Sequence, residues 1–223
     1  MAELITGLSV PRVRANLAAV NDKIAAACAR AGRSAGDVRT LAAVKYVAEA
    51  EIGVLAEAGI TLAGENRAQQ LTRKARLAPE LEWHFIGHLQ SRKVKDVVPY
   101  VTLIHSVSSE SVVGQLERHA PPGTAVLVEV NVSGEEGKSG IAPAQLADFI
   151  AGCRDRAGAD VRGLMTMPPL AADPEQSRPW FAALAALAAE HGLPELSMGT
   201  TQDFAVAVEE GATIVRIGSR LYA

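Results

Sequence analysis

Aromatic residues are scarce in this chain of 223 residues, since Phe, Trp and Tyr together make up only 4%. Hydrophobic residues still make up 48%, so the core has to be built mainly from Ala, Val, Leu and Ile. Basic residues are not in excess, because 22 Lys and Arg stand against 25 Asp and Glu and give a net charge of −3. General binders of nucleic acid or anionic membranes carry a basic excess. We therefore expect no nucleic-acid partner and no membrane partner.

Cysteine is also rare, with Cys28 and Cys153 in two separate helical patterns and no Cys-x-x-Cys spacing. This argues against a disulfide framework and fits a reducing compartment, so we expect a cytoplasmic protein. The N-terminus shows no long apolar stretch after a basic start, and no apolar run reaches about 18 residues, the length of a membrane-spanning helix. We expect neither a signal peptide nor a membrane span.

Short apolar segments alternate with Ala-rich amphipathic segments along the whole chain. The apolar segments are candidate strands at 38–44, 60–64, 83–87, 102–107, 125–132, 161–167, 195–199 and 213–218. They are apolar on both faces, as parallel strands covered by helices are. Helical patterns lie between them, for example at 48–59, 65–77, 143–158 and 178–192. About eight strand–helix repeats predict an α/β fold, a single (β/α)8 TIM barrel forming one domain over residues 1–223.

The ends of this barrel depart from the simple repeat. Residues 10–32 have a long helical pattern with no strand before it, and the chain stops at Ala223 just after the eighth strand. We expect no helix after that strand, and we expect the extra N-terminal helix to help close the barrel instead. An open doubly wound sheet is the alternative, which the strand count and the lack of a linker disfavour.

Functional residues of a barrel lie where its strands end. The segment LAAVK (41–45) ends a buried strand with Lys45. A lysine at a strand end commonly extends its ammonium into solvent around an apolar stem. In a partly desolvated barrel mouth its pKa would fall, and the neutral amine could form a Schiff base with an aldehyde. Taken alone, Lys45 favours the interpretation of an ordinary solvent-exposed lysine at a strand end.

The last two strands shift that balance. SMGTTQDF (197–204) brings a glycine and two threonines to the start of a helix, and VRIGS (215–219) follows with another glycine and a serine. Backbone N–H groups at a helix start beside hydroxyls favour a phosphate, and phosphate sites in barrels often follow strands seven and eight. Each segment alone is also compatible with an ordinary glycine turn and helix cap. Both together predict a phosphate site.

Arg216 lies inside the apolar strand TIVRIG (213–218). A buried guanidinium stays charged and needs a partner. That partner is either a carboxylate, such as Glu129 in VLVEVNV, or an acceptor on a ligand. A Schiff-base lysine, a phosphate cradle and an arginine facing a ring nitrogen together indicate pyridoxal 5'-phosphate (PLP).

Several segments carry a resemblance to a known family, namely LAAVK, GEN (64–66), WHFIGHLQSRK, LIHSVSS, VNVSGEEGKSGI, VRGLMTM and LSMGTTQDFAVAVEEGATIVRIGS. Over about residues 10–222 the chain resembles the pyridoxal phosphate homeostasis proteins, formerly called proline synthetase co-transcribed homologues. The resemblance implies the fold-type III, alanine racemase-like barrel and a Schiff base on Lys45. It also implies cofactor contacts from the residues Asn66, Ser197, Gly199, Thr200, Thr201, Arg216, Gly218 and Ser219. The family is thought to buffer or deliver PLP and has no established turnover.

Some positions depart from the family's usual pattern. Many members have Lys-Thr-Lys-Pro where this chain has KYVA (45–48), so Val47 replaces a second lysine and a transfer role of that lysine is in question here. Thr201 and Ser219 each replace another hydroxyl residue, which should preserve phosphate binding.

An arginine opposite the pyridine nitrogen disfavours ring protonation and weakens the ring as an electron sink. Racemases of this fold type add a tyrosine base from a second domain and the partner subunit, and we expect no room for that domain here. Of the three tyrosines (Tyr46, Tyr100 and Tyr222), only Tyr46 neighbours the site. We therefore expect a monomeric binding and delivery protein without catalytic residues, with apo PLP-dependent enzymes as possible partners. A PLP-dependent racemase or lyase, and a barrel enzyme for a phosphorylated metabolite without PLP, are the alternatives.

Three further patterns are weaker. GEEGKSG (134–140) lacks the first glycine of a P-loop, since position 132 is Val132. His84 and His88 have no accompanying carboxylate or thiol cluster, so we expect no metal site. The basic run SRKVK (91–95) is either a solvated helix face or a docking patch for a cofactor-dependent enzyme.

Overall fold

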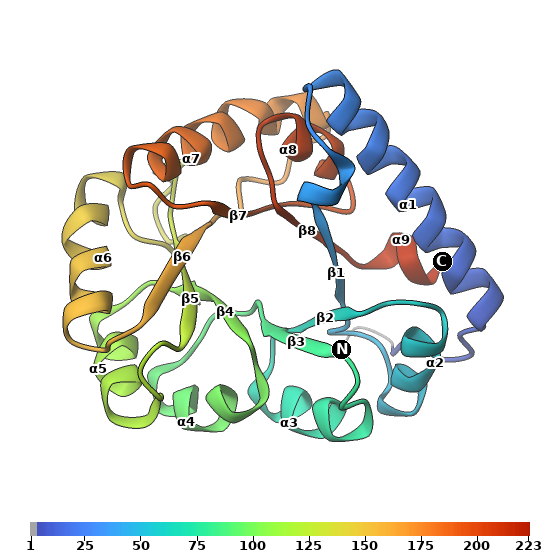
Figure 1. Cartoon of the computed structure of the whole chain (residues 1–223), viewed down its shortest axis with the longest axis horizontal. Helices are drawn as coiled ribbons and strands as arrows, with labels where there is room; N and C mark the ends of the chain where they lie inside the picture. Colours follow the sequence, from blue (N-terminus) through green and yellow to red (C-terminus); the bar gives the residue numbers. More distant parts are fainter. Residues whose placement is uncertain (1–3) are drawn as a thin grey trace.

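The computed structural model describes residues 4–223 and shows eight parallel strands inside a ring of helices (Figure 1). Residues 1–3 of the expected domain lie outside the described residues. The strands are β1 (Arg39–Ala43), β2 (Leu62–Glu65), β3 (Glu82–Phe85), β4 (Leu103–Val107), β5 (Ala125–Glu129), β6 (Asp160–Met165), β7 (Glu195–Thr200) and β8 (Ile214–Ile217). The helices are α1 (Val10–Arg30), α2 (Ile52–Glu57), α3 (Ala68–Leu77), α4 (Val94–Val97), α5 (Glu110–His119), α6 (Leu146–Asp155), α7 (Arg178–Glu190), α8 (Phe204–Glu209) and α9 (Ser219–Tyr222).

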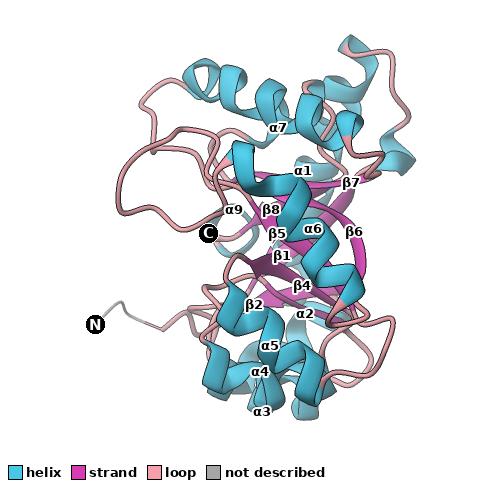
Figure 2. Ribbon diagram, turned by 90° about the vertical axis from the view of Figure 1, so that its left-hand side faces the viewer, coloured by secondary structure: helices cyan, strands magenta, loops and turns pink. Residues whose placement is uncertain are grey.

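The sheet is closed, because β1 pairs in parallel with β2 on one side and with β8 on the other. This confirms the predicted barrel and excludes the open doubly wound sheet. Each of the eight candidate segments contains or overlaps one observed strand. The longest loops follow β5 and β6, at the carboxyl end of the barrel. Figure 2 shows the helices on both sides of the strands, with the longer loops gathered at one end.

The strands form because both of their faces are buried in apolar surroundings. Every residue of β4 and β5 is buried. One apolar cluster fills the barrel interior and consists of Leu41, Leu62, Leu103, Ala125, Leu127, Met165 and Ile214. A larger cluster lies between the strands and the surrounding helices. Burial of this aliphatic surface replaces the aromatic core that the composition does not provide.

The N-terminal helix α1 begins after Ser9, whose side chain accepts a hydrogen bond from the backbone N–H of Arg12. Its buried residues include Val13, Val20 and Ile24, which repeat at helical spacing. In Figure 1, α1 runs along the outside of the barrel beside α8 and α9. The predicted extra N-terminal helix is confirmed, and it packs against α8 and α9.

The expectation that no helix follows the eighth strand is wrong. The short helix α9 follows β8 and buries Leu221 and Tyr222. The backbone of its C-terminal end binds α1, because Asn16 Nδ2 donates to the carbonyl oxygens of Leu221 and Ala223 at 3.1 and 2.9 Å. Four residues are too few to show a helical period in the sequence.

Both cysteines are free and buried, Cys28 in α1 and Cys153 in α6. Burial raises the pKa of the Cys153 thiol to about 12, so this thiol is unreactive at neutral pH. Within residues 4–223, no helix has both the length and the apolar character needed to cross a membrane.

Candidate functional site

The predicted cofactor residues lie on or just after four strands, β7, β8, β1 and β2, which are consecutive around the closed barrel. The fold therefore brings together residues that are more than 170 positions apart in sequence, such as Lys45 and Arg216. The set consists of Lys45, Asn66, Ser197, Gly199, Thr200, Thr201, Arg216, Gly218 and Ser219.

Lys45 lies two residues beyond the end of β1, and its side chain is exposed. Lys45 therefore lacks the partial burial that would favour its neutral amine. The Lys45 ammonium lies 5.0 Å from the centroid of the Tyr46 ring, which is 38% exposed. The amine is thus open to an incoming ligand on the carboxyl side of the barrel.

The backbone just before Lys45 is held by a buried ion pair. Lys74 Nζ lies 2.7 Å from Glu65 Oε2 and donates to the carbonyl oxygen of Val44, also at 2.7 Å. Glu65 Oε1 accepts from the backbone N–H groups of Asn66 and Arg67. One ion pair therefore fixes both the end of β1 and the turn that carries Asn66. Lys74 was not predicted as a functional residue, although a lysine on the buried stripe of α3 was a signal for it.

Tyr222 adds a second support to the same strand end. Its hydroxyl donates to the carbonyl oxygen of Ala43 at 3.2 Å, so α9 is bonded to β1. Burial raises the pKa of Tyr222, which stays protonated and can act only as a neutral hydroxyl. One predicted helix, α3, and one missed helix, α9, thus converge on the residues that precede Lys45.

Arg216 is 5% exposed and forms no ion pair with any carboxylate of residues 4–223. Its Nη1 donates to the carbonyl and hydroxyl oxygens of Ser197 at 2.7 and 2.6 Å. Its Nη2 donates to the Thr166 carbonyl at 2.9 Å and contacts Met167 Sδ at 2.8 Å. Burial lowers the pKa of Arg216 to about 10, which leaves the guanidinium charged at neutral pH. The Nε–H group donates to no described residue.

Glu129, the alternative partner of Arg216, is occupied elsewhere. Its Oε1 accepts from the Ser139 hydroxyl at 2.6 Å, and its Oε2 is buried without a hydrogen-bond partner in the described residues. The predicted alternative of a direct Arg216–Glu129 ion pair is therefore wrong. Asn66 Oδ1 is the other buried side-chain oxygen without a described partner. Buried polar atoms are rarely left unpaired, so both mark positions where a ligand or water is expected.

The loops after β7 and β8 meet, as the predicted phosphate site requires. The backbone N–H of Gly218 donates to Thr201 Oγ1 at 3.0 Å. The Asp203 carboxylate accepts from both the backbone N–H and the hydroxyl of Thr200, at 2.7 and 3.1 Å. Both donors of Thr200 are therefore occupied by Asp203, and Thr200 is less available to an anion than Thr201 and Ser219.

The local packing explains why position 199 is a glycine, which the sequence did not reveal. Its φ is +86°, and a Cβ built there would lie 2.5 Å from the Cβ of Ala207 in α8. A side chain would therefore push α8 away from the end of β7. Gly199 lets the helix pack closely, and this does not require any ligand.

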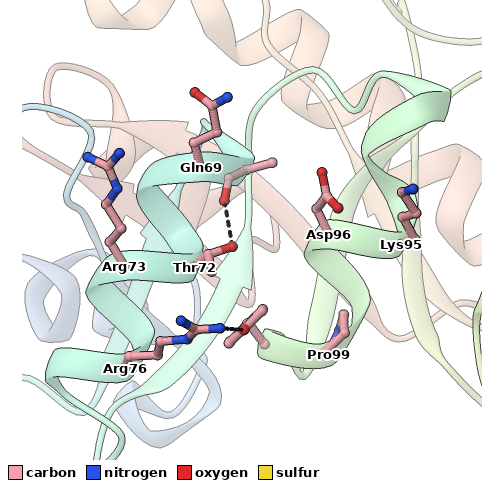
Figure 3. Close-up of a pocket in the computed structure, with 9 residues that line it drawn as sticks. Gln69, Thr72, Arg73, Arg76, Lys95, Asp96 and Pro99 are labelled. Carbon is pink, nitrogen blue, oxygen red and sulfur yellow. Dashed lines mark hydrogen bonds between the residues drawn. The ribbon is translucent and has the colours of Figure 1, made fainter.

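A hollow with a volume of about 640 Å³ lies on the outside of the barrel between α3 and α4. Figure 3 shows its labelled side chains: α3 contributes Arg73 and Arg76, while Lys95 and Asp96 come from α4. Arg76 reaches the Tyr100 hydroxyl at 2.8 Å. A smaller hollow of about 300 Å³ adjoins it through Ala68 and Gln69 and extends to Asn66 at the barrel mouth. We call the basic residues along both hollows the basic face; they are Arg67, Arg73, Arg76, Arg92, Lys93 and Lys95.

Two weaker sequence patterns have other roles in the structure. Both ring nitrogens of His84 are bonded to other side chains, while His88 is exposed. No group of three or more His, Cys, Asp or Glu side chains within residues 4–223 is arranged to hold a metal ion. In the GEEGKSG loop, the Lys138 ammonium pairs with Glu135 at 3.0 Å.

The chain matches the family described as "Alanine racemase, N-terminal domain" over residues 15–223. The pyridoxal phosphate homeostasis protein of Aquifex aeolicus (strain VF5) is 41% identical over 217 residues, covering 92% of this chain and 95% of that protein. PipY of Synechococcus elongatus PCC7942, solved with PLP bound, has a TM-score of 0.79 at 28% identity, covering 95% of this chain and 100% of PipY. The alanine racemase of Corynebacterium glutamicum shares the fold, with a TM-score of 0.71 at 17% identity over 99% of this chain and 63% of that one. The chain therefore belongs to the alanine racemase N-terminal domain family and, within it, to the pyridoxal phosphate homeostasis proteins.

Proposed function

We propose that this protein binds PLP at the ends of β7, β8, β1 and β2 and takes part in PLP homeostasis by buffering or delivering the cofactor. The observation that carries the proposal is the pairing of an exposed amine, Lys45, with a buried and unpaired guanidinium, Arg216, at the same end of one barrel. A ligand with an aldehyde, a phosphate and a ring nitrogen suits both groups. Membership of the homeostasis family supports the same ligand.

The residues present fit this group in several ways. Arg216 has one N–H group, on Nε, that donates to no described residue and could donate to a ring nitrogen. The Thr201 hydroxyl, which accepts from Gly218 and keeps its own proton to donate, and the backbone N–H of Ser219 are suited to the phosphate. The buried Asn66 Oδ1 lacks a described partner and can accept from a ligand hydroxyl. When bound, PLP supplies an electrophilic aldehyde, to which the Lys45 amine would add with loss of water to form a Schiff base.

We propose further that the protein has no strong catalytic turnover. The Arg216 guanidinium opposite the ring nitrogen would keep that nitrogen unprotonated, which weakens the cofactor as an electron sink. One observation favours the alternative of a racemase or lyase, namely the phenol of Tyr46 beside Lys45. Turnover of alanine or serine on the order of 1 s⁻¹ or faster would establish that alternative, whereas no measurable turnover supports the homeostasis role.

A spectral titration tests cofactor binding. PLP is added to the purified protein, to Lys45→Arg, which keeps the charge but not the nucleophilic amine, and to Lys23→Arg on the exposed side of α1 as the control. We expect a saturable Schiff-base absorption band in the wild type and in Lys23→Arg, and none in Lys45→Arg. A wild type that stays colourless would favour the third alternative, a barrel acting on a phosphorylated metabolite without PLP.

For delivery, we propose that the acidic surface of an apo PLP-dependent enzyme docks on the basic face. The residues that line the two hollows include six basic side chains and one acidic side chain, Asp96, in a chain whose total charge is −3. The smaller hollow connects this face to Asn66 at the mouth, so a docked partner would lie next to the cofactor site. We also propose that the protein is a monomer and cytoplasmic.

Transfer of PLP from the loaded protein to an apo-enzyme tests the docking proposal. The double variant Arg73→Glu/Arg76→Glu should slow transfer about tenfold at low salt and less at high salt, because long-range attraction steers association. Arg118→Glu/Arg154→Glu, on α5 and α6, is the matched control, since both arginines are exposed, line neither hollow and give the same change of charge. Equal transfer rates for all three proteins would show that the basic face is only a solvated surface.

A further inference from the structure

Polar side chains cross the apolar barrel interior from one end to the other. Arg216 Nη1 donates to Ser197 Oγ at 2.6 Å, and Ser197 Oγ lies 2.8 Å from His105 Nδ1. His105 Nε2 lies 2.8 Å from His84 Nδ1, and His84 Nε2 lies 2.9 Å from Glu82 Oε1. These five residues come from β8, β7, β4 and β3, and we call them the buried relay.

The buried relay runs through the core rather than over the surface. His84, His105 and Ser197 are each 0% exposed, and Arg216 is 5% exposed. Glu82 is the first residue of β3 and lies at the amino end of the barrel, where it also pairs with Arg39. A cation near the ligand site is thus linked, through three uncharged groups, to an anion at the opposite end of the barrel.

The direction of each hydrogen bond follows from the cationic end. A guanidinium can only donate, so Ser197 Oγ accepts from Arg216. The hydroxyl proton of Ser197 is then directed at His105 Nδ1, its other partner. A neutral His105 that accepts at Nδ1 carries its proton on Nε2, and it donates this proton to His84 Nδ1. His84 in turn donates from Nε2 to Glu82.

The anionic end gives the same direction independently. The hydrogen bond from His84 lowers the pKa of Glu82 to about 2, so Glu82 is an ionised acceptor at neutral pH. It requires a proton on His84 Nε2, which leaves Nδ1 of a neutral His84 as an acceptor for His105. Burial lowers the pKa of both His84 and His105, which keeps both rings neutral. Both ends therefore specify one tautomer, with the proton on Nε2, for each histidine.

We propose that Glu82, His84, His105 and Ser197 are positioning residues for the cofactor: they form one unidirectional hydrogen-bond chain that holds Arg216 in place and stabilises its charge without a direct counter-ion. This inference rests on the proposed function. A carboxylate bonded directly to Arg216 would compete with a ligand for the guanidinium. The relay instead places the balancing charge at the other end of the barrel and leaves the Nε–H group available.

The charged groups that face the two imidazoles come from four strands and are Arg39 of β1, Glu82 of β3, Glu195 of β7 and Arg216 of β8. Burial is the largest influence on both rings, and Arg39 and Arg216 lower the pKa of His105 further, whereas Glu82 partly opposes the effect of burial on His84. We therefore expect the tautomers to persist across the physiological pH range. An added proton on either ring would turn one acceptor into a donor and break a link of the relay.

The first test needs neither a cofactor nor a variant. Nitrogen-15 NMR of histidine-labelled protein, without ligand, reports the protonation of each ring nitrogen from pH 5 to 8. We expect His84 and His105 to stay neutral with the proton on Nε2 over this whole range. A charged ring, or a proton on Nδ1 at pH 7, in His84 or His105 would overturn the proposal.

The second test measures the affinity for PLP by spectral titration. Ser197→Ala cuts the relay beside Arg216 and should weaken binding about tenfold, as expected for one hydrogen bond to a charged group. Glu82→Gln removes the anionic end with little change in shape and should weaken binding several-fold. Thr102→Val is the matched control, because Thr102 bonds Glu82 Oε1 from outside the relay, and it should leave the affinity within about twofold.

The outcomes separate this inference from the proposed function. A wild type that does not bind PLP would defeat both. A wild type that binds PLP, with Ser197→Ala and Glu82→Gln binding equally well, would defeat only the relay. Weaker binding in both variants, with the control unchanged and the NMR pattern as expected, supports the relay.

Discussion

Two buried cations lie beside strands that contribute to the candidate site, and they are neutralised in different ways. On the β1–β2 side, Lys74 pairs directly with Glu65 and its ammonium also binds the Val44 carbonyl. On the β7–β8 side, Arg216 donates to neutral oxygens and a thioether, without a direct carboxylate partner. The difference teaches that Lys74 serves the structure, while the charge of Arg216 remains available to a ligand.

The largest expected effect comes from breaking the direct pair. Lys74→Met leaves the Glu65 carboxylate buried and unpaired, and we expect the free energy of unfolding to fall by about 3–5 kcal/mol. Urea unfolding measures the change. The double variant Lys74→Met/Glu65→Gln is the control and should recover part of the loss, because no charge then remains unpaired. A loss below about 1 kcal/mol in the single variant would show that the pair does not support the fold.

Removing the other cation should affect binding more than stability. Arg216→Met leaves only neutral groups behind, so we expect a loss of about 1–2 kcal/mol in the free energy of unfolding. We expect PLP affinity to fall by about 10- to 100-fold, the range for losing a charged hydrogen-bond donor. If Arg216→Met were as destabilising as Lys74→Met and bound PLP normally, the contrast between the two cations would be wrong.

Acidification should act on the relay. The pKa of His105 is well below its ordinary value of 6.5 in the folded protein, so below pH 6.5 the unfolded chain binds a proton that the native state does not. The stability contribution of neutral His105 is complete above pH 6.5 and falls as pH decreases, by up to about 1.4 kcal/mol per pH unit. Glu82 adds a further loss between its ordinary pKa of 4.5 and about 2.

Urea unfolding at a series of pH values measures this slope between pH 6.5 and 5. His105→Leu removes the titrating group. The slope of the unfolding free energy against pH should fall by up to the amount that one bound proton contributes, about 1.4 kcal/mol per pH unit. An unchanged slope in His105→Leu would show that His105 is not held neutral by the fold.

The smallest effect is expected for Tyr222, which supports the end of β1. Tyr222→Phe removes only the hydrogen bond to the Ala43 carbonyl, so we expect a loss of about 1 kcal/mol in the free energy of unfolding. The Schiff-base band should be retained, because Lys74 still holds the neighbouring Val44 carbonyl. Loss of the band in a folded Tyr222→Phe protein would mean that α9 contributes more to the site than this one bond.

The fold was largely predictable from the sequence because parallel strands buried on both faces leave a strong apolar signal. All eight strands and α1 were placed on that basis. The ends of the elements were less predictable, and α9 was missed. The strand ends also indicated Lys45 and Arg216, because charged residues next to apolar runs stand out.

The partners of those residues could not be predicted in the same way. The sequence indicates that Arg216 and Glu129 are both buried, but not where each side chain points around the barrel, so the suggested ion pair was wrong. His84, His105 and Ser197 interrupt apolar strands that are far apart in sequence, and only closure of the barrel brings them into contact. The position of Lys74 on the buried stripe of α3 indicated that it is buried, but nothing in the sequence indicated that its partner is Glu65.

The central claim is that Lys45 holds PLP opposite Arg216. The most direct measurement is borohydride reduction of the PLP-loaded protein, followed by mass mapping of the modified peptide, with Lys45→Arg treated in parallel. The account predicts one reduced adduct, on Lys45, and none in the variant. A protein that takes up no PLP, or an adduct spread over other lysines and unchanged in Lys45→Arg, would contradict it.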